Sequence, residues 1–278
     1  TIVGTLSDEI CEELDIPKCD VIAVASHDTQ SAMVAVPSAE DNFIFISCGT
    51  WSLLGTELER PLINERSNHY NITNEGGYGG KASFLKNITG LWLVQESRRQ
   101  WIREGRDYSF SELEQMACES EPFQCFIDPD APEFAVSGNI PRRIQEYCRR
   151  TGQKVPVNAG DTVRCINESL ALKYRLSMEE ISDCTGSKYD KIHMVGGGIK
   201  SKLLCQLTAD ACGCTVIAGP VEATVLGNIA VQLIALGEIA DLKEARAIIS
   251  KSPDITYYEP KDKKAWDEIF ERYKKVIL

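Results

Sequence analysis

Apolar residues along this chain occur either in short contiguous runs or at every third or fourth position. The first pattern predicts strands and the second predicts helices. Short, β-branched apolar runs predict strands at 21–26, 43–48, 51–56, 191–195 and 214–219. Apolar residues recurring every three or four positions predict helices, at 28–36, 87–104, 110–119, 139–151, 159–185, 200–212, 222–237, 241–250 and 260–276. Alternating strands and helices in the last third indicate an α/β fold, and a hairpin at Gly49-Thr50 makes its sheet mixed.

Composition and charge narrow the class of protein. The 278 residues can bury one large core or two smaller ones. A formal charge of −11 argues against nucleic-acid binding, but a single nucleotide needs only a local cradle of backbone N–H groups. No apolar run approaches the roughly 20 residues of a membrane span, and no signal peptide is visible. We therefore expect a cytoplasmic protein.

The eleven cysteines do not form a recognisable metal or redox motif. There is no Cys-x-x-Cys, and the three histidines, His27, His69 and His193, are too scattered to indicate a zinc site. We expect mostly buried free thiols and no metal ligands. Cys148 and Cys165 lie on successive predicted helices, and the sequence leaves open whether they form a disulfide.

Asp28 is the first candidate for chemistry. It stands where a predicted strand ends and a predicted helix begins, which holds a carboxylate at the edge of a sheet. Such a group can accept a proton from a substrate hydroxyl, an effect of roughly 10²–10⁴-fold on rate. Asp is also a preferred helix N-cap, and the spacing alone favours that structural role.

Two glycine-containing turns are candidate phosphate sites. Gly49-Thr50 offers backbone N–H groups and a hydroxyl between two strands, although an ordinary hairpin turn explains the same pattern. Gly196, Gly197 and Gly198 join a strand to a helix, so a ligand can approach the backbone closely at a helix N-terminus. Neither the Rossmann nor the P-loop spacing is present, and a purely structural turn stays open.

A family resemblance adds to this reading. It rests on five segments that keep their order and spacing from about residue 21 to 237: VIAVASHDTQSAMVAVP, SCGTWSLLG, NITNEGG, LKNITGLWLVQE and IHMVGGGIKSKLLCQLTADACGCTVIAGPVEATVLGNIAVQ. Together they resemble the FGGY carbohydrate kinases, and among them the branch that acts on L-rhamnulose. The resemblance implies an actin-like, ribonuclease-H-type fold of two lobes, and transfer of phosphate from ATP to L-rhamnulose with Mg²⁺.

The resemblance also implies roles for single residues. Asp28 corresponds to the catalytic base for the sugar's C1 hydroxyl, and His27, Thr29 and Asn87 correspond to sugar contacts beside it. The nucleotide would be held by Gly49, Thr50, Gln95, Gly196, Gly197 and Gly198. Family members begin with a lobe that this sequence lacks. We therefore expect 1–38 to be the tail of that N-terminal lobe and 39–278 to be the C-terminal kinase domain.

Two departures and three alternatives accompany the resemblance. Ile199-Lys200-Ser201 stands where a Gln-Asn-like pair is expected, and the last helix, 260–276, is expected to pack towards the absent lobe and to expose an apolar stripe here. The alternatives are a sister kinase for another ketose such as L-fuculose, a non-catalytic actin-like nucleotide-binding module, and a thiol-based or metal-binding protein. Asp28 together with Asn87 disfavours the second, and cysteine number alone supports the third.

Overall fold

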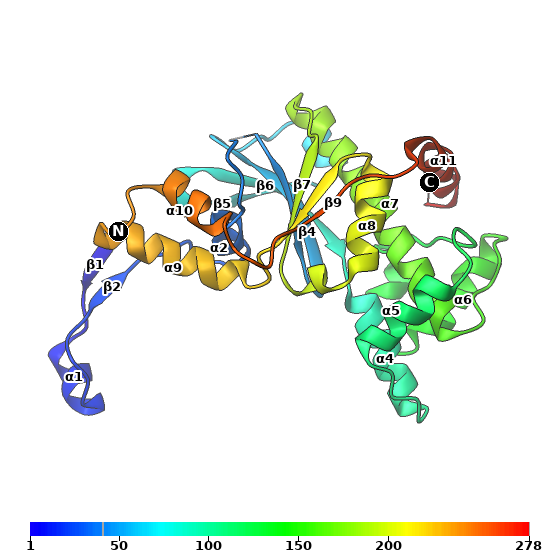
Figure 1. Ribbon diagram of the computed structural model, residues 1–278, viewed down its shortest axis with the longest axis horizontal. Helices are drawn as coiled ribbons and strands as arrows, with labels where there is room; N and C mark the ends of the chain where they lie inside the picture. The colour runs from blue at the N-terminus through cyan, green and yellow to red at the C-terminus, as the bar shows by residue number, and fades with distance from the viewer. Residues whose placement is uncertain (41, 278) are drawn as a thin grey trace.

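A mixed β-sheet crosses the middle of the molecule and carries helices on both faces (Figure 1). The computed structural model describes residues 1–40 and 42–277. Within these, the sheet has seven strands in the order β5-β6-β4-β3-β7-β8-β9. Their bounds are β3 Ile44–Cys48, β4 Trp51–Leu58, β5 Thr73–Gly76, β6 Ala82–Thr89, β7 Lys191–Val195, β8 Thr215–Ala218 and β9 Thr256–Tyr258. β3, β7 and β8 are parallel, and the flanking pairs are antiparallel, so the predicted mixed sheet is confirmed.

The helices form a layer on each face of this sheet. Their bounds are α2 Asp28–Val34, α3 Glu65–His69, α4 Trp92–Arg103, α5 Phe110–Glu119, α6 Ile140–Arg150, α7 Ala159–Thr185, α8 Lys202–Cys212, α9 Ala223–Leu236, α10 Leu242–Ile249 and α11 Lys263–Ile277, with short 3₁₀ turns at Tyr78–Gly80, Pro132–Phe134 and Gly197–Lys200. α2 packs against α9 and the sheet, with α10 beside α9. α7 and α8 cover the opposite face, and α4, α5 and α6 extend from that side (Figure 1).

The central strand β3 shows why its sequence is an unbroken apolar run. Phe45 points to the α2 face, where it packs with Met33, while Ile44 and Ile46 point to the core beneath α7 and α8. All three strand residues are fully buried. A strand covered on both faces needs apolar residues at every position.

The first 22 residues form a separate arm. β1 (Ile2–Thr5) and β2 (Asp20–Ile22) pair with each other, α1 (Asp8–Leu14) connects them, and the arm projects away from the sheet (Figure 1). The prediction of a buried strand at 21–26 is therefore wrong, because β2 ends at Ile22, Val21 is 38% exposed and residues 23–26 form no strand. The described residues give this segment no strand partner except β1, so its apolar residues are not enclosed by a sheet.

Two other predictions need correction. The helix predicted at 87–104 begins only at Trp92, because β6 continues through Asn87 to Thr89. The last helix does not expose an apolar stripe: Trp266, Phe270 and Tyr273 are buried against α7 and α8. Among the described helices, none combines the length and the hydropathy required to cross a membrane.

Candidate active site

Two turns meet at one edge of the sheet. Because β3 and β7 are parallel neighbours, the residues that follow them, Gly49-Thr50 and Gly196–Gly198, lie side by side. A Cβ atom on Gly198 would lie 2.3 Å from Cys48 Sγ, so glycine is what lets the turns approach. Gly196 has a φ of +89°, which glycine adopts without strain. Ligands of open α/β sheets bind at this edge, beyond the carboxyl ends of the parallel strands.

The hairpin turn is joined to the start of α4. The Thr50 carbonyl accepts hydrogen bonds from the backbone N–H groups of Gly90 and Trp92, at 3.2 and 3.0 Å. The Thr50 hydroxyl donates to Gln95 Oε1 at 3.2 Å, one turn into the helix. The fold thus brings Thr50 and Gln95 together, although they are 45 residues apart in the sequence.

A cavity of about 980 Å³ opens between these turns and helices α5, α7 and α8. Of the six residues expected to hold a nucleotide, its lining includes Gly49, Thr50, Gln95, Gly197 and Gly198, but not Gly196. This volume lies within the range of ligand sites, roughly 300–1,000 Å³.

The rest of the lining combines apolar and charged side chains. Leu113, Val163 and Leu203 are among its apolar members. Lys200 and Lys202 are its only basic residues among those described, and Glu114 is its only acidic one. The wall is therefore locally positive although the chain carries a formal charge of −11.

Two cavity residues were missed by sequence reasoning. Asn167 on α7 is 3% exposed, and its Oδ1 has no hydrogen-bond partner among the described residues. A buried polar atom without a partner is costly, so it points to a ligand or water in the cavity. Glu114 accepts hydrogen bonds from Ser201 Oγ and Leu203 N at the start of α8, at 3.1 and 2.7 Å. Neither belongs to a short motif, because the packing of distant helices brings them to the cavity.

Asp28 lies on the face of the sheet opposite the cavity, but at the same edge, where the parallel strands end. It is the first residue of α2, and His27 rather than Asp28 occupies the N-cap position, without a side-chain capping bond. The Thr224 hydroxyl at the start of α9 donates to the Asp28 carbonyl at 3.2 Å, and α9 follows the end of β8. This contact places Asp28 at the edge where the parallel strands end.

The Asp28 carboxylate is accessible. Its side chain is 78% exposed, and Oδ1 accepts a hydrogen bond from Thr29 N at 2.6 Å. His27 Nδ1 lies 3.3 Å from the same oxygen, whereas Thr29 is buried at 3% exposure. Of the expected sugar contacts, His27 and Asp28 therefore face solvent, while Thr29 supports Asp28 from within.

Asn87 lies on β6 rather than on a helix, and its side chain is exposed. Its strand neighbours Ser83 and Leu85 lie on the face that contacts α2. Since side chains of a strand alternate between faces, Asn87 shares that face with them. β6 ends opposite Trp51, so Asn87 lies near the same edge as Asp28.

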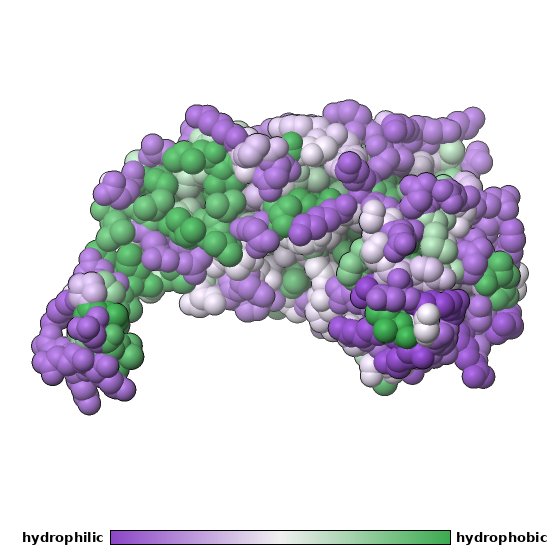
Figure 2. Space-filling model, turned by 60° about the horizontal axis from the view of Figure 1, so that its bottom comes forward, coloured by the Kyte–Doolittle hydropathy of each residue, from purple (hydrophilic) through white to green (hydrophobic). Residues whose placement is uncertain are grey.

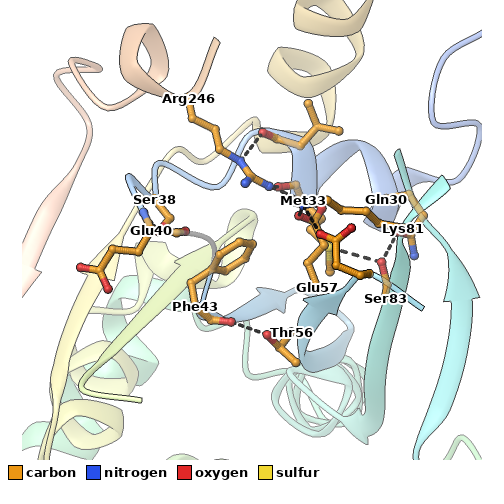
Figure 3. Close-up of polar contacts among 12 residues, drawn as sticks. Gln30, Met33, Ser38, Glu40, Phe43, Thr56, Glu57, Lys81, Ser83 and Arg246 are labelled. Carbon is orange, nitrogen blue, oxygen red and sulfur yellow. Dashed lines mark hydrogen bonds and ion pairs between the residues drawn. The ribbon is translucent and has the colours of Figure 1, made fainter. Parts of the chain in front are cut away.

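Buried polar contacts fix α2 to the sheet (Figure 3). Arg246 of α10 donates to the carbonyl groups of Met33 and Val34 at 3.1 and 3.3 Å, which satisfies the end of α2. Its guanidinium also lies over the Phe43 ring and 3.7 Å from Glu57. Because α2 is held at its C-terminal end, the position of Asp28 at the other end is defined by the fold.

The described residues do not provide a cage for Mg²⁺. Their one group of three or more adjacent potential ligand side chains consists of Cys125, Cys148 and Cys165, and Mg²⁺ requires oxygen ligands. A magnesium ion in such a site is commonly held by phosphate oxygens, water and one or two carboxylates.

Comparison with known proteins defines the class. The C-terminal domain of the FGGY family of carbohydrate kinases matches residues 44–236. The chain therefore belongs to the FGGY family of carbohydrate kinases.

Curated relatives are more specific. A rhamnulokinase of Bacteroides thetaiotaomicron is 42% identical over 275 residues, which are 99% of this chain and 56% of that protein. A rhamnulokinase of Bacillus subtilis is 42% identical over 260 residues, 94% of this chain and 53% of that protein. The chain thus spans about half the length of the curated relatives it matches.

Solved structures agree with the expected actin-like fold. The gluconate kinase of Lactobacillus acidophilus superposes with a TM-score of 0.72 at 14% identity, over 99% of this chain and 55% of that one. The glycerol kinase of Plasmodium falciparum, solved with ADP, superposes with a TM-score of 0.71 at 14% identity. The match covers 99% of this chain and 54% of that one. At such identity the likeness concerns the fold alone.

Proposed function

We propose that this chain is the nucleotide-binding lobe of a kinase that transfers the γ-phosphoryl group of ATP to the C1 hydroxyl of L-rhamnulose. The observation that carries the proposal is the cavity of about 980 Å³ that ends at the Gly49-Thr50 and Gly196–Gly198 turns. Backbone N–H groups at such turns bind phosphate oxygens without net positive charge. The curated rhamnulokinases at about 42% identity supply the choice of sugar.

The cavity is large enough for a nucleotide, and Asn167 on α7 lines it together with the Gly49-Thr50 and Gly197-Gly198 turns. We assign the turns to the phosphates and the apolar lining residues Leu113, Val163 and Leu203 to the adenine ring.

Asn167 is our candidate for recognition of the base. An asparagine amide can pair with adenine through two hydrogen bonds, accepting from N6–H and donating to a ring nitrogen. Guanine would instead present an oxygen to the amide oxygen. Gln95 and Thr50 are assigned to the nucleotide beside the phosphates.

Asp28 lies on the α2 face of the sheet, at the same edge as the two turns. There it accepts the proton of the C1 hydroxyl while that oxygen attacks the γ-phosphorus and ADP leaves. His27 and Asn87 position the sugar, and buried Thr29 positions the Asp28 carboxylate. Phosphoryl transfer depends mainly on alignment and charge stabilisation. An accessible carboxylate that α2 holds in position can therefore act as the general base. Mg²⁺ would accompany ATP and neutralise phosphate charge, with ligands from outside this chain. A kinase that consumes ATP fits the expected cytoplasmic location.

A second lobe completes this proposal. Exposed apolar side chains gather at the end of the molecule that carries α9 and the N-terminal arm (Figure 2). They include Val225, Ile229 and Leu236 on α9 and Val3 and Leu14 in the arm. Apolar patches of this kind mark interaction surfaces. We propose that an N-terminal sugar-binding lobe covers these side chains. In this proposal, residues 1–38 are the tail of that lobe and 39–278 are the second lobe. Helix α2 belongs to the tail by sequence but packs against α9 and β3 of the second lobe.

The test is a coupled ADP-release assay on a two-lobe enzyme, made by joining this chain to the N-terminal lobe of a relative such as the B. subtilis rhamnulokinase. With ATP and Mg²⁺, we expect turnover to depend on L-rhamnulose. Equal or faster turnover with L-fuculose would establish the sister-kinase alternative instead. Nucleotide binding without turnover on any ketose would favour the non-catalytic module.

A further inference from the structure

Three cysteines that are far apart in the sequence meet inside the protein. Cys125 follows α5, Cys148 lies on α6 and Cys165 lies on α7. Their sulfur atoms all lie within 4.8 Å of one another, and the residues are 4%, 0% and 2% exposed. All three are free thiols, so Cys148 and Cys165 are close together but not joined in a disulfide.

We propose that Cys125, Cys148 and Cys165 form a site for one thiophilic metal ion, Zn²⁺. Zinc–sulfur bonds of about 2.3 Å in a tetrahedral site separate the sulfurs by about 3.8 Å. The observed cluster needs a contraction of at most about 1 Å to reach that geometry, and rotation of short cysteine side chains can supply it. Soft sulfur ligands select zinc over magnesium or calcium.

The surroundings offer a fourth position and a route of entry. A small cavity of about 40 Å³ adjoins the cluster and is lined by Cys125, Cys165 and Glu168, with Glu121 and Lys154 at its exposed side. It has room for a water molecule, which can complete a three-sulfur site. A metal ion can therefore reach the sulfurs without the core unfolding.

Metal binding at this cluster is coupled to proton release, because the thiolate is the form of cysteine that binds a metal. Binding of Zn²⁺ forms three Zn–S bonds and releases the thiol protons to solvent. Affinity for zinc should therefore increase as the pH rises. The bound ion would clamp α6 and the segment after α5 onto α7, which also carries Asn167.

The test uses the full chain, stripped of metal with a chelator and kept reduced with a phosphine that does not compete for zinc. We expect one Zn²⁺ per chain after gel filtration. Cys148→Ala should lower the affinity by at least about tenfold, in line with the loss of a metal-site residue. Cys118→Ala, a change at an exposed cysteine of α5, is the matched control and should bind zinc like the parent.

Alkylation of the unmodified chain, read by mass spectrometry, gives an independent measurement if Cys148→Ala fails to fold. Zinc should slow labelling of the three clustered cysteines and leave exposed Cys19 and Cys118 unchanged. The proposal is overturned if the parent chain retains no stoichiometric zinc, or if bound zinc protects other cysteines but not these three. Neither readout depends on the kinase activity.

Discussion

Gly197 provides the sharpest test of the nucleotide site, because its neighbour Gly198 provides a matched structural control. A Cβ atom on Gly197 would meet no heavy atom within 4 Å, and Gly197 lines the cavity. A Cβ atom on Gly198 would lie 2.3 Å from the sulfur and 2.9 Å from the carbonyl oxygen of Cys48. Valine at 197 should therefore enter the ligand space, whereas alanine at 198 should strain the fold.

The expected magnitude follows from contact distances. A phosphate oxygen accepts from a backbone N–H at about 2.9 Å, but a carbon atom requires about 3.5–4 Å, so Gly197→Val pushes the nucleotide back by about 1 Å. Loss of one hydrogen bond to a charged group costs about 1.5–3 kcal/mol, which is roughly a 10–150-fold rise in the Kd for ATP. Gly198→Ala should instead cost about 1–3 kcal/mol of stability through overpacking.

Isothermal titration with ATP and thermal unfolding of both variants separate these effects. Gly197→Val should keep its Tm within about 2 °C and lose ATP affinity, and in a two-lobe enzyme its sugar affinity should be unchanged. Gly198→Ala should lose several degrees of Tm, at about 2–4 °C per kcal/mol. An ATP Kd within threefold of the parent in folded Gly197→Val would refute the assignment of this turn to the nucleotide.

Four other predictions test separate parts of the account. In a two-lobe enzyme, Asp28→Asn should cut turnover by at least about a hundredfold with sugar binding retained, and turnover within threefold of the parent would make Asp28 a structural residue. Asn167→Leu should reduce the preference for ATP over GTP, by the roughly 1–3 kcal/mol of a two-hydrogen-bond contact; an unchanged ratio of the two Kd values contradicts base recognition. Burial lowers the pKa of His193 from 6.5 to about 4, so the unfolded chain binds the extra proton first and stability is lost as the pH falls through this window. Urea unfolding should show about 2 kcal/mol lost to this group between pH 7.5 and 5, and His193→Gln, if folded, should remove that part of the slope. Finally, the 278-residue chain alone should bind ATP without phosphorylating sugar, because alignment requires both lobes; sugar-dependent ADP release at about 1 s⁻¹ or more would disprove this.

Long elements with regular apolar spacing were predictable. The helix at 159–185 and the strand at 191–195 coincide with α7 and β7. The start of α4 was not predictable from the sequence. Leu91 precedes the helix without a side-chain capping bond, and the chain passes directly from strand to helix around Gly90. β9 was missed, since only three residues, Thr256–Tyr258, pair at the sheet edge.

The site was predictable where its residues belong to contiguous motifs. Gly49-Thr50 and the three glycines stand beside strands whose parallel pairing brings them together. Asn167 and the cysteine cluster were not recognisable, because they depend on how α5, α6 and α7 pack. The predicted helices suggested that Cys148 and Cys165 could approach each other, but nothing in the sequence indicated that Cys125 would join them.

The position of the new phosphate tests the central claim most directly. The two-lobe enzyme is incubated with L-rhamnulose, ATP and Mg²⁺, and the sugar product is examined by phosphorus–proton NMR. We expect the phosphorus to couple to the two protons on C1, and we expect Asp28→Asn to abolish this product. A sugar phosphorylated at another carbon, or no phosphorylated sugar from an enzyme that binds ATP, would contradict it.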